Sequence, residues 1–226
     1  MSTTSIGAVP PAAGASTPRR RNRRGEATRQ AILDAAVTCL QRTGYAATSI
    51  EAVMSESGIG RGSLLNQFPN RLELMAGVAE FAMTRMVAHA RTQLSAMDDP
   101  RARLFALAEM AWQSHNLPES TAVTEILLAS RWDEQLAVKV RDLAKVAECD
   151  IDRLNLALAR ESGIADIPGF LVLGRLLNST LKGLTIELML NPDRDMILKA
   201  VRRAKSDYID QCERILADRT GHRGAA

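Results

Sequence analysis

The segment Thr48–Arg71, TSIEAVMSESGIGRGSLLNQFPNR, constrains the fold more than any other part of this chain. Ile50 and Val53 fall on one face of a first short helix. Gly58 then stands where a chain that leaves a helix often needs a positive backbone dihedral, and residues 60–67 form the next helix. A helix, a tight turn and a second helix are typical of the helix-turn-helix unit, whose second helix reads DNA bases. An ordinary helical bundle with a tight turn is the alternative.

Capping signals mark where the helices of this segment begin. Thr48 and Glu51 have the spacing of a capping box, in which the threonine hydroxyl accepts from the Glu51 amide and the carboxylate reaches back to the Thr48 amide. Asn70 and Glu73 have the same spacing ahead of a third helix. We therefore predict that helices start after Thr48 and after Asn70.

Two features upstream favour the DNA-binding interpretation. Residues 27–43 have the apolar spacing of an amphipathic helix, and a basic arm that suits phosphates or a minor groove precedes them. The arginines of the arm are Arg19, Arg20, Arg21, Arg23 and Arg24. Residues 1–90 contain ten arginines and six acidic residues, a net charge of +4, which leaves −1 for the rest of a chain whose total is +3. Positive charge therefore gathers beside the motif, as a phosphate-binding surface requires.

A longer pattern, from about Gly25 to Ala79, surrounds the motif. Its residues are Arg29, Ile32, Leu33, Ala35, Ala36, Leu40, Gly44, Tyr45, Thr48, Ser49, Ile50, Val53, Ser57, Gly58, Ile59, Gly62, Leu64, Phe68 and the RLEL that begins at Arg71. In order and spacing they resemble the N-terminal DNA-binding domain of the TetR family of transcriptional regulators. The resemblance implies an all-α protein of about nine helices, with an N-terminal three-helix helix-turn-helix domain and a C-terminal helical domain for ligand binding and dimerisation.

The chain departs from the family pattern at three positions. Leu65 stands where the family usually has a tyrosine that contacts a phosphate, and leucine cannot donate a hydrogen bond. Gly60 stands where serine or threonine often caps the recognition helix, and glycine is a weaker cap. Arg71 replaces the usual lysine and keeps its positive charge. Asn66 or the arginine arm could supply the contact that Leu65 lacks.

The expected DNA contacts follow from the motif and the resemblance. We expect Arg61 to read a base, because a guanidinium suits the paired acceptors of guanine. Gly62 would let the backbone approach DNA closely. Thr48 and Ser49 are either phosphate contacts or only helix caps. The other expected contacts are Ser63, Asn66 and Gln67 toward bases and Arg71 toward a phosphate.

Downstream of the motif the chain is predicted to be helical throughout, with no convincing strand alternation. We expect a linking helix over 70–97, then helices at about 100–114, 118–131, 133–161 and 166–190, and a last helix that starts at Asn191–Pro192. The predicted organisation is a disordered basic arm at 1–24, a DNA-binding domain at 25–85, a helical effector-binding and dimerisation domain at 86–217, and a disordered tail at 218–226.

The segment 166–190 is apolar on nearly all sides, so it must be covered on more than one face. It is either the central core helix of one chain or part of a four-helix dimer interface. The resemblance favours a homodimer formed through the helices at about 166–190 and 193–217. Such a dimer would hold two recognition helices about 34 Å apart and would read a palindromic operator in double-stranded DNA.

The resemblance also implies a cavity among the C-terminal helices, whose ligand shifts the spacing of the two DNA-binding domains. The residues that we expect to line it are Met83, Met86, Met110, Trp112, Glu125, Leu128 and Trp132. Each of them could instead be ordinary core. The methionines and tryptophans indicate a small, mostly apolar effector.

No chemistry beyond binding is indicated. Cys39, Cys149 and Cys212 are isolated, and no group of cysteines and histidines has the spacing of metal ligands. The chain has no glycine-rich phosphate loop or nucleophile elbow, so we expect no metal, no cofactor and no enzymatic activity. It also has no signal peptide and no long apolar run, so we expect a cytoplasmic protein with no membrane partner.

These observations predict a dimeric DNA-binding transcriptional regulator. By family default it is a repressor that binds a palindromic operator and is released by a small effector. The alternative is an effector-independent or architectural DNA-binding protein, which would show little preference for one DNA sequence over another.

Overall fold

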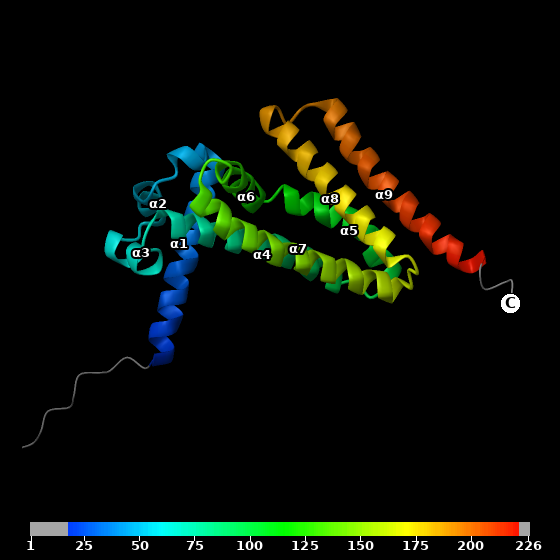
Figure 1. The fold of residues 1–226 in the computed structure, drawn as a ribbon, viewed down its shortest axis with the longest axis horizontal. Helices are drawn as coiled ribbons and strands as arrows, with labels where there is room; N and C mark the ends of the chain where they lie inside the picture. The colour runs from blue at the N-terminus through cyan, green and yellow to red at the C-terminus, as the bar shows by residue number, and fades with distance from the viewer. Residues whose placement is uncertain (1–17, 222–226) are drawn as a thin grey trace, which may run out of the picture.

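A computed structural model describes residues 18–221, and their side chains over 23–217. This part of the chain folds into nine α-helices and no strand (Figure 1), which confirms the all-α prediction. The helices are α1 (Pro18–Ala47), α2 (Ile50–Ser57), α3 (Arg61–Gln67), α4 (Arg71–Ser95), α5 (Pro100–His115), α6 (Pro118–Ala129), α7 (Glu134–Ser162), α8 (Ile167–Leu190) and α9 (Asp195–Gly221). Helices α1 to α3 lie at one end of an elongated molecule, and α8 and α9 lie at the other.

Helix α1 is interrupted at Gly44, whose φ of 77° lies in the left-handed region that glycine enters most readily. The regular part of the helix therefore ends near Thr43, as the amphipathic pattern predicted. The interruption turns the Tyr45 N–H toward α6, where it donates to Oε2 of Glu125 at 2.8 Å. The end of α1 is thereby attached to the C-terminal half of the chain.

The residue that caps α2 is Ser49 rather than Thr48. The Ser49 hydroxyl accepts from the Ala52 amide at 3.1 Å, whereas Thr48 is fully buried and its hydroxyl donates to the Gly44 carbonyl at 2.8 Å. The predicted capping box of Thr48 with Glu51 is therefore wrong, because the turn after α1 uses the Thr48 side chain.

Two other local predictions are confirmed. Gly58 ends α2 in the left-handed conformation, with a φ of 67°. Asn70 caps α4, and its side-chain oxygen accepts from the Glu73 amide at 2.9 Å. At both positions, backbone groups at a helix end that would otherwise lack a hydrogen-bond partner have one. The turns on either side of α3 are therefore well defined.

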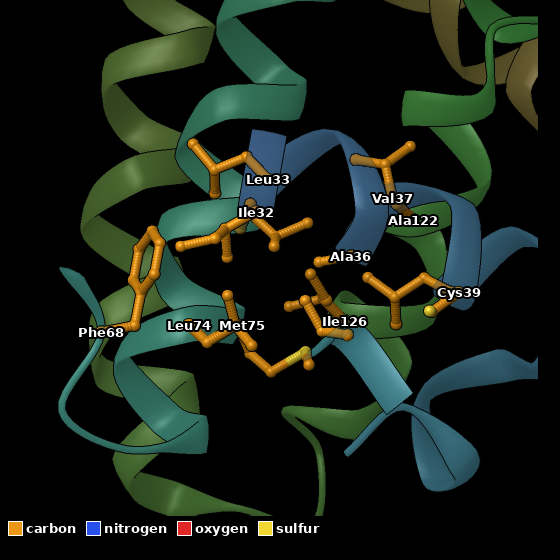
Figure 2. Packing of buried hydrophobic residues seen from close by; sticks show 14 of the residues in the cluster. Ile32, Leu33, Ala36, Val37, Cys39, Phe68, Leu74, Met75, Ala122 and Ile126 are labelled. Carbon is orange, nitrogen blue, oxygen red and sulfur yellow. The ribbon is translucent and has the colours of Figure 1, made fainter. Parts of the chain in front are cut away.

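The core beneath the helix-turn-helix is shared with the C-terminal helices (Figure 2). Ile32 and Ala36 of α1 pack in one cluster with Phe68 and with the start of α4. The same cluster contains residues of α6 and α7, namely Ala122, Ile126, Leu136 and Val140. The expected domain boundary at 85/86 falls inside α4, which runs without interruption from this cluster into the rest of the molecule.

Gly77 of α4 is the point of closest approach in this core. A Cβ at Gly77 would lie 2.6 Å from Cε1 of Phe68, so the ring or the helix would have to shift. We expect Gly77→Ala to lower the free energy of unfolding by about 1–3 kcal/mol in urea denaturation. Gly62→Ala, where a Cβ meets nothing within 4 Å, is the control and should not be destabilising. An unchanged stability of Gly77→Ala would show that the ring moves freely.

Helices α8 and α9 form an antiparallel pair that packs on α5 (Figure 1). A second core cluster joins them to α5, and its largest buried side chains include Leu104, Phe170, Leu177 and Tyr208. The Tyr208 hydroxyl donates to the Leu104 carbonyl at 3.3 Å. The apolar side of α9 therefore packs against other helices of the same chain.

Three expected boundaries differ from the structure. Helix α9 starts at Asp195 instead of Asn191–Pro192, because the Asn191 side chain accepts from the Asp193 amide and forms a turn there. The backbone is helical from Pro18 where a disordered arm 1–24 was expected, since proline suits a first turn and arginine is a good helix former. Helix α9 also continues through 218–221 of the expected tail. The remaining residues of the arm and the tail, 1–17 and 222–226, lie outside the described part.

None of the helices in the described range is long and apolar enough to cross a membrane.

Candidate DNA-binding surface and effector cavity

Helix α3 presents a polar face and buries an apolar one. Leu64 and Phe68 are buried in the core beneath it. The exposed residues of the helix are Arg61, Gly62, Ser63 and Asn66, and Gln67 is half-buried. The N-terminal residues predicted to read DNA are thus accessible, and two apolar anchors hold them in position.

Arg61 is oriented by an acidic neighbour on α2. Its guanidinium lies 2.8 Å from Oε1 of Glu51, and its side chain is 60% exposed. The hydrogen bond from Arg61 is the main cause that holds the pKa of the Glu51 carboxyl below its usual value. Exposed ion pairs contribute little to stability, so Arg61 can exchange Glu51 for a base at small cost.

Neither the backbone conformation nor the packing of the chain requires glycine at position 60, and packing does not require it at position 62. Gly60 precedes α3 with ordinary extended backbone and makes no side-chain cap. A Cβ at Gly60 or Gly62 would meet nothing within 4 Å. Leu65, in the position of the family tyrosine, is half-buried and packs against the core cluster. The backbone at Gly60 and Gly62 is therefore open to close approach by another molecule.

Arg71 is occupied within the protein. Its Nε donates to the Thr48 carbonyl at 2.9 Å, another nitrogen donates to the Tyr45 carbonyl, and the guanidinium stacks on the Tyr45 ring at 4.1 Å. Arg71 therefore fixes the turn between α1 and α2. These positions disfavour the expected phosphate contacts of Thr48 and Arg71, because Thr48 is buried and Arg71 donates to backbone carbonyls.

Most other arginines of the helix-turn-helix region are also paired. Arg42 pairs with Glu56 at 2.9 Å, and Arg29 stacks on the ring of Phe68. Arg23 and Arg24 are exposed, and within the described part of the chain no ion pair involves them. The side chains of Arg19, Arg20 and Arg21 lie outside that part. The positive charge free to meet phosphates thus lies at the start of α1.

The contribution of this charge can be measured by its salt dependence. We expect the double variant Arg23→Ala/Arg24→Ala to bind all DNA sequences more weakly. Its plot of log affinity against log salt concentration should be less steep by about 0.9 for each phosphate that the variant no longer neutralises. Arg160→Ala/Arg202→Ala, at exposed arginines of α7 and α9, is the control. An unchanged slope in Arg23→Ala/Arg24→Ala would assign phosphate binding to other residues.

A cavity of about 260 Å³ lies among the C-terminal helices. This is slightly below the usual range for small-molecule pockets, about 300–1,000 Å³. Its apolar lining includes Met83, Met86, Val87, Leu107, Val123 and Leu127, from α4, α5 and α6. Its polar lining includes His115, Asn155, Asn178 and Lys182, from α5, α7 and α8. Of the residues expected to line an effector cavity, Met83 and Met86 are in the lining of this one.

The other five expected cavity residues lie elsewhere. Met110 is buried in the second core cluster, and Trp112 packs against that cluster. Glu125 binds the Tyr45 amide, while Leu128 and Trp132 are 54% and 86% exposed.

The polar lining residues His115, Asn155, Asn178 and Lys182 were not among those expected. A signal for Asn178 and Lys182 is present in the sequence, because they interrupt the most apolar segment of the chain four positions apart. Two polar side chains at that spacing share one face of a helix, so they mark a polar patch on α8.

Burial disfavours the charged forms of two ionisable groups at the cavity. His115 is buried, with Nε2 only 2.6 Å from Oδ1 of Asn178, and burial is the main cause that lowers its pKa. Burial also lowers the pKa of Lys182. The imidazole is therefore neutral near pH 7, and the ammonium is incompletely solvated.

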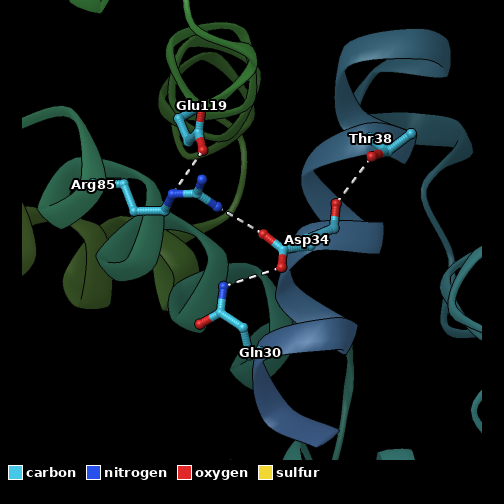
Figure 3. A network of polar contacts seen from close by, with 5 residues as sticks. All are labelled: Gln30, Asp34, Thr38, Arg85 and Glu119. Carbon is cyan, nitrogen blue, oxygen red and sulfur yellow. Dashed lines mark hydrogen bonds and ion pairs between the residues drawn. The ribbon is translucent and has the colours of Figure 1, made fainter. Parts of the chain in front are cut away.

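Arg85 connects the cavity helices with the DNA-binding end (Figure 3). It lies on α4 and pairs with Asp34 of α1 at 2.8 Å and with Glu119 of α6 at 3.1 Å. Glu119 is almost fully buried, so leaving it without Arg85 would be costly. The three helices are thereby held in one arrangement close to Met83 and Met86.

Helix α8 carries an apolar face that nothing in the single chain covers. The residues of this face, hereafter the α8 stripe, recur at threes and fours and are Val172, Leu176, Ser179, Gly183, Ile186 and Leu190. All six are exposed. The outer face of α9 is instead mostly charged. The opposite face of α9 is apolar and is buried or half-buried within the chain, through Ile197, Val201, Ala204, Tyr208 and Ile215.

Comparisons with known proteins agree with this architecture. Residues 32–78 match the model of the bacterial regulatory proteins, tetR family. The fold is similar to a transcriptional regulator from Rhodococcus sp. Rha1, at 17% identity and a TM-score of 0.64 over 81% of this chain and 94% of that one. It is also similar to a TetR transcription regulator from Haloarcula marismortui ATCC 43049, at 19% identity and a TM-score of 0.64 over 82% and 98% of the two chains. The fatty acid degradation regulator FadR from Bacillus halodurans matches at 18% identity and a TM-score of 0.61, over 80% and 94%. No curated protein matches by sequence.

A helix-turn-helix with an accessible recognition helix, joined to a helical body, defines a DNA-binding transcriptional regulator. Residues 32–78 carry the DNA-binding domain of the bacterial regulatory proteins, tetR family, and the described helices share the fold of solved regulators of that kind.

Proposed function

We propose that the chain is a homodimeric repressor that binds a palindromic operator and leaves it when a small effector enters the cavity. The observation that carries this proposal is the course of α4. Its first turns, with Leu74 and Met75, belong to the core beneath the recognition helix. Further along the same helix, Met83 and Met86 line the cavity. A ligand in the cavity therefore presses on the helix that supports the DNA-reading unit.

Two further contacts support such coupling. Glu125 accepts from the Tyr45 amide at the end of α1, and its neighbour on α6, Leu127, lines the cavity. Arg85 joins α1, α4 and α6. An effector that binds one arrangement of these helices more tightly than the other would shift the population between them. Release of DNA requires that the favoured arrangement fits the operator less well.

The α8 stripe supports the dimer. An apolar face of this length is costly in water, and a second copy of the same stripe covers it by a two-fold interface. Ser179 and Gly183 at its centre are small and would let the two helices approach closely. Two recognition helices held about 34 Å apart would then read two half-sites one DNA turn apart.

A DNA titration at fixed salt tests the proposal. The probe is the intergenic fragment beside the gene of this protein, and the competitor is a scrambled fragment of equal length and composition. We expect the intergenic fragment to bind at least about 10³-fold more tightly. Equal affinity for both fragments would contradict a specific repressor and would favour the architectural alternative.

A further inference from the structure

The cavity has one polar wall and one apolar wall. Asn178 and Lys182 are four residues apart on α8, so they lie on the same face of that helix. Met83, Met86 and Val87 of α4 contribute apolar surface to the same cavity. A ligand that satisfies both walls is itself amphipathic, with a small polar group at one end of an apolar body.

On the α8 side of the cavity the unused hydrogen-bonding capacity consists of donors, whereas Nδ1 of His115 on α5 is a buried acceptor without a partner. Neutral His115 donates from Nε2 to Oδ1 of Asn178, because an amide oxygen only accepts. The acceptor of Asn178 is therefore occupied, and its N–H groups remain. Lys182 offers three further N–H groups and has no acceptor. The group that these residues recognise is consequently an acceptor.

The charge of the wall points the same way. Arg175 lines the cavity but is held by Asp152 at 3.0 Å, and it lies 3.9 Å from Glu148, the acidic residue of the lining. Within the described part of the chain, Lys182 has no ion pair. A partly buried ammonium without a counter-charge is unfavourable, and a bound anion relieves it. Among the described residues, Lys182 is therefore the cation of the lining that no carboxylate pairs.

We infer that the effector is a small monocarboxylic acid with an apolar body, whose carboxylate binds Lys182 and Asn178 and whose body lies against the methionines of α4. One lysine and one amide suit a singly charged anion with two acceptor oxygens. The cavity volume of about 260 Å³ accommodates a body of the size of a short alkyl chain or a single ring. This inference rests on the proposed function, because it names the ligand of the proposed effector cavity.

Calorimetric titration of the full chain without DNA tests the inference. The probes are hexanoate and 3-phenylpropanoate, each compared with its primary amide. We expect at least one acid to bind about 10-fold or more tightly than its amide. Lys182→Met should weaken binding of that acid by about 10- to 100-fold and weaken binding of the amide much less, because the amide loses a hydrogen bond but no charge pairing. Lys145→Met, at an exposed lysine of α7, is the control and should bind the acid as the wild type does.

Amide binding by Lys182→Met reports that the cavity of the variant is intact. Equal affinity of acid and amide would overturn the inference, as would undiminished acid binding by Lys182→Met or no binding of either acid. All titrations use protein free of DNA. A failure here therefore leaves specific operator binding untouched, and a failure of operator binding leaves the acid measurement valid.

Discussion

Leu176→Asp will convert the proposed homodimer into monomers and weaken operator binding by about 10²- to 10⁴-fold. Leu176 lies in the α8 stripe and is 62% exposed in the single chain, so an aspartate there should leave the monomer folded. Across a two-fold interface, however, two carboxylates would be buried near each other without partners. The loss of affinity follows because a monomer binds only one half-site and forfeits the avidity of two linked sites.

Sedimentation velocity and an operator titration measure the two effects. The matched control is Val146→Asp on α7, because Val146 is apolar and 61% exposed but lies outside the α8 stripe. The control should remain dimeric and bind DNA normally. A dimer that survives Leu176→Asp would exclude the α8 stripe as the interface.

Arg61→Ala will cost about 1–3 kcal/mol of operator binding at each half-site and relax the preference for one base pair. Arg61 is exposed at the N-terminal end of α3, and its partner Glu51 is an exposed carboxylate that it can leave. The measurement is a competition titration at fixed salt, with operators that vary one base pair at a time. The salt slope should change little, since a base contact releases few counterions.

Arg42→Ala is a closely matched control. Arg42 also belongs to an exposed arginine–glutamate pair, at 2.9 Å from Glu56, and its side chain is 64% exposed. It lies on α1 outside the recognition helix. Its removal should leave the sequence preference intact. If Arg61→Ala retains full operator affinity, another residue of α3 reads the base.

The helix-turn-helix could be predicted because its determinants are local. Gly58 and Asn70 specify the turns on either side of α3 through their own backbone and side-chain bonds. The error at Thr48 has both a local and a distant cause. Its hydroxyl is used by the Gly44 carbonyl, and the turn at Gly44 is itself held by Glu125 of α6. A capping pattern in sequence carries no information about such a contact.

The cavity was harder to predict because five helices form it. Periodicity shows that a helix has an apolar side but not which neighbour that side meets, so Met83 and Met110 look alike in sequence. In the structure Met83 lines the cavity, whereas Met110 is buried in the second core cluster. For the same reason, the sequence does not distinguish the sides of α8 and α9 that pack within one chain from the sides that face outward. Only packing shows that Tyr208 faces α5 within one chain and that Leu176 faces outward.

Two copies of α3, held by a dimer, are proposed to read a two-fold symmetric DNA site. Selection of bound fragments from a pool of random DNA, followed by sequencing, tests this directly. We predict an enriched palindrome whose half-site centres lie about 10 base pairs apart, with strong preference at one position that Arg61→Ala abolishes. An enriched pool without two-fold symmetry, or one with no enriched sequence, would contradict it.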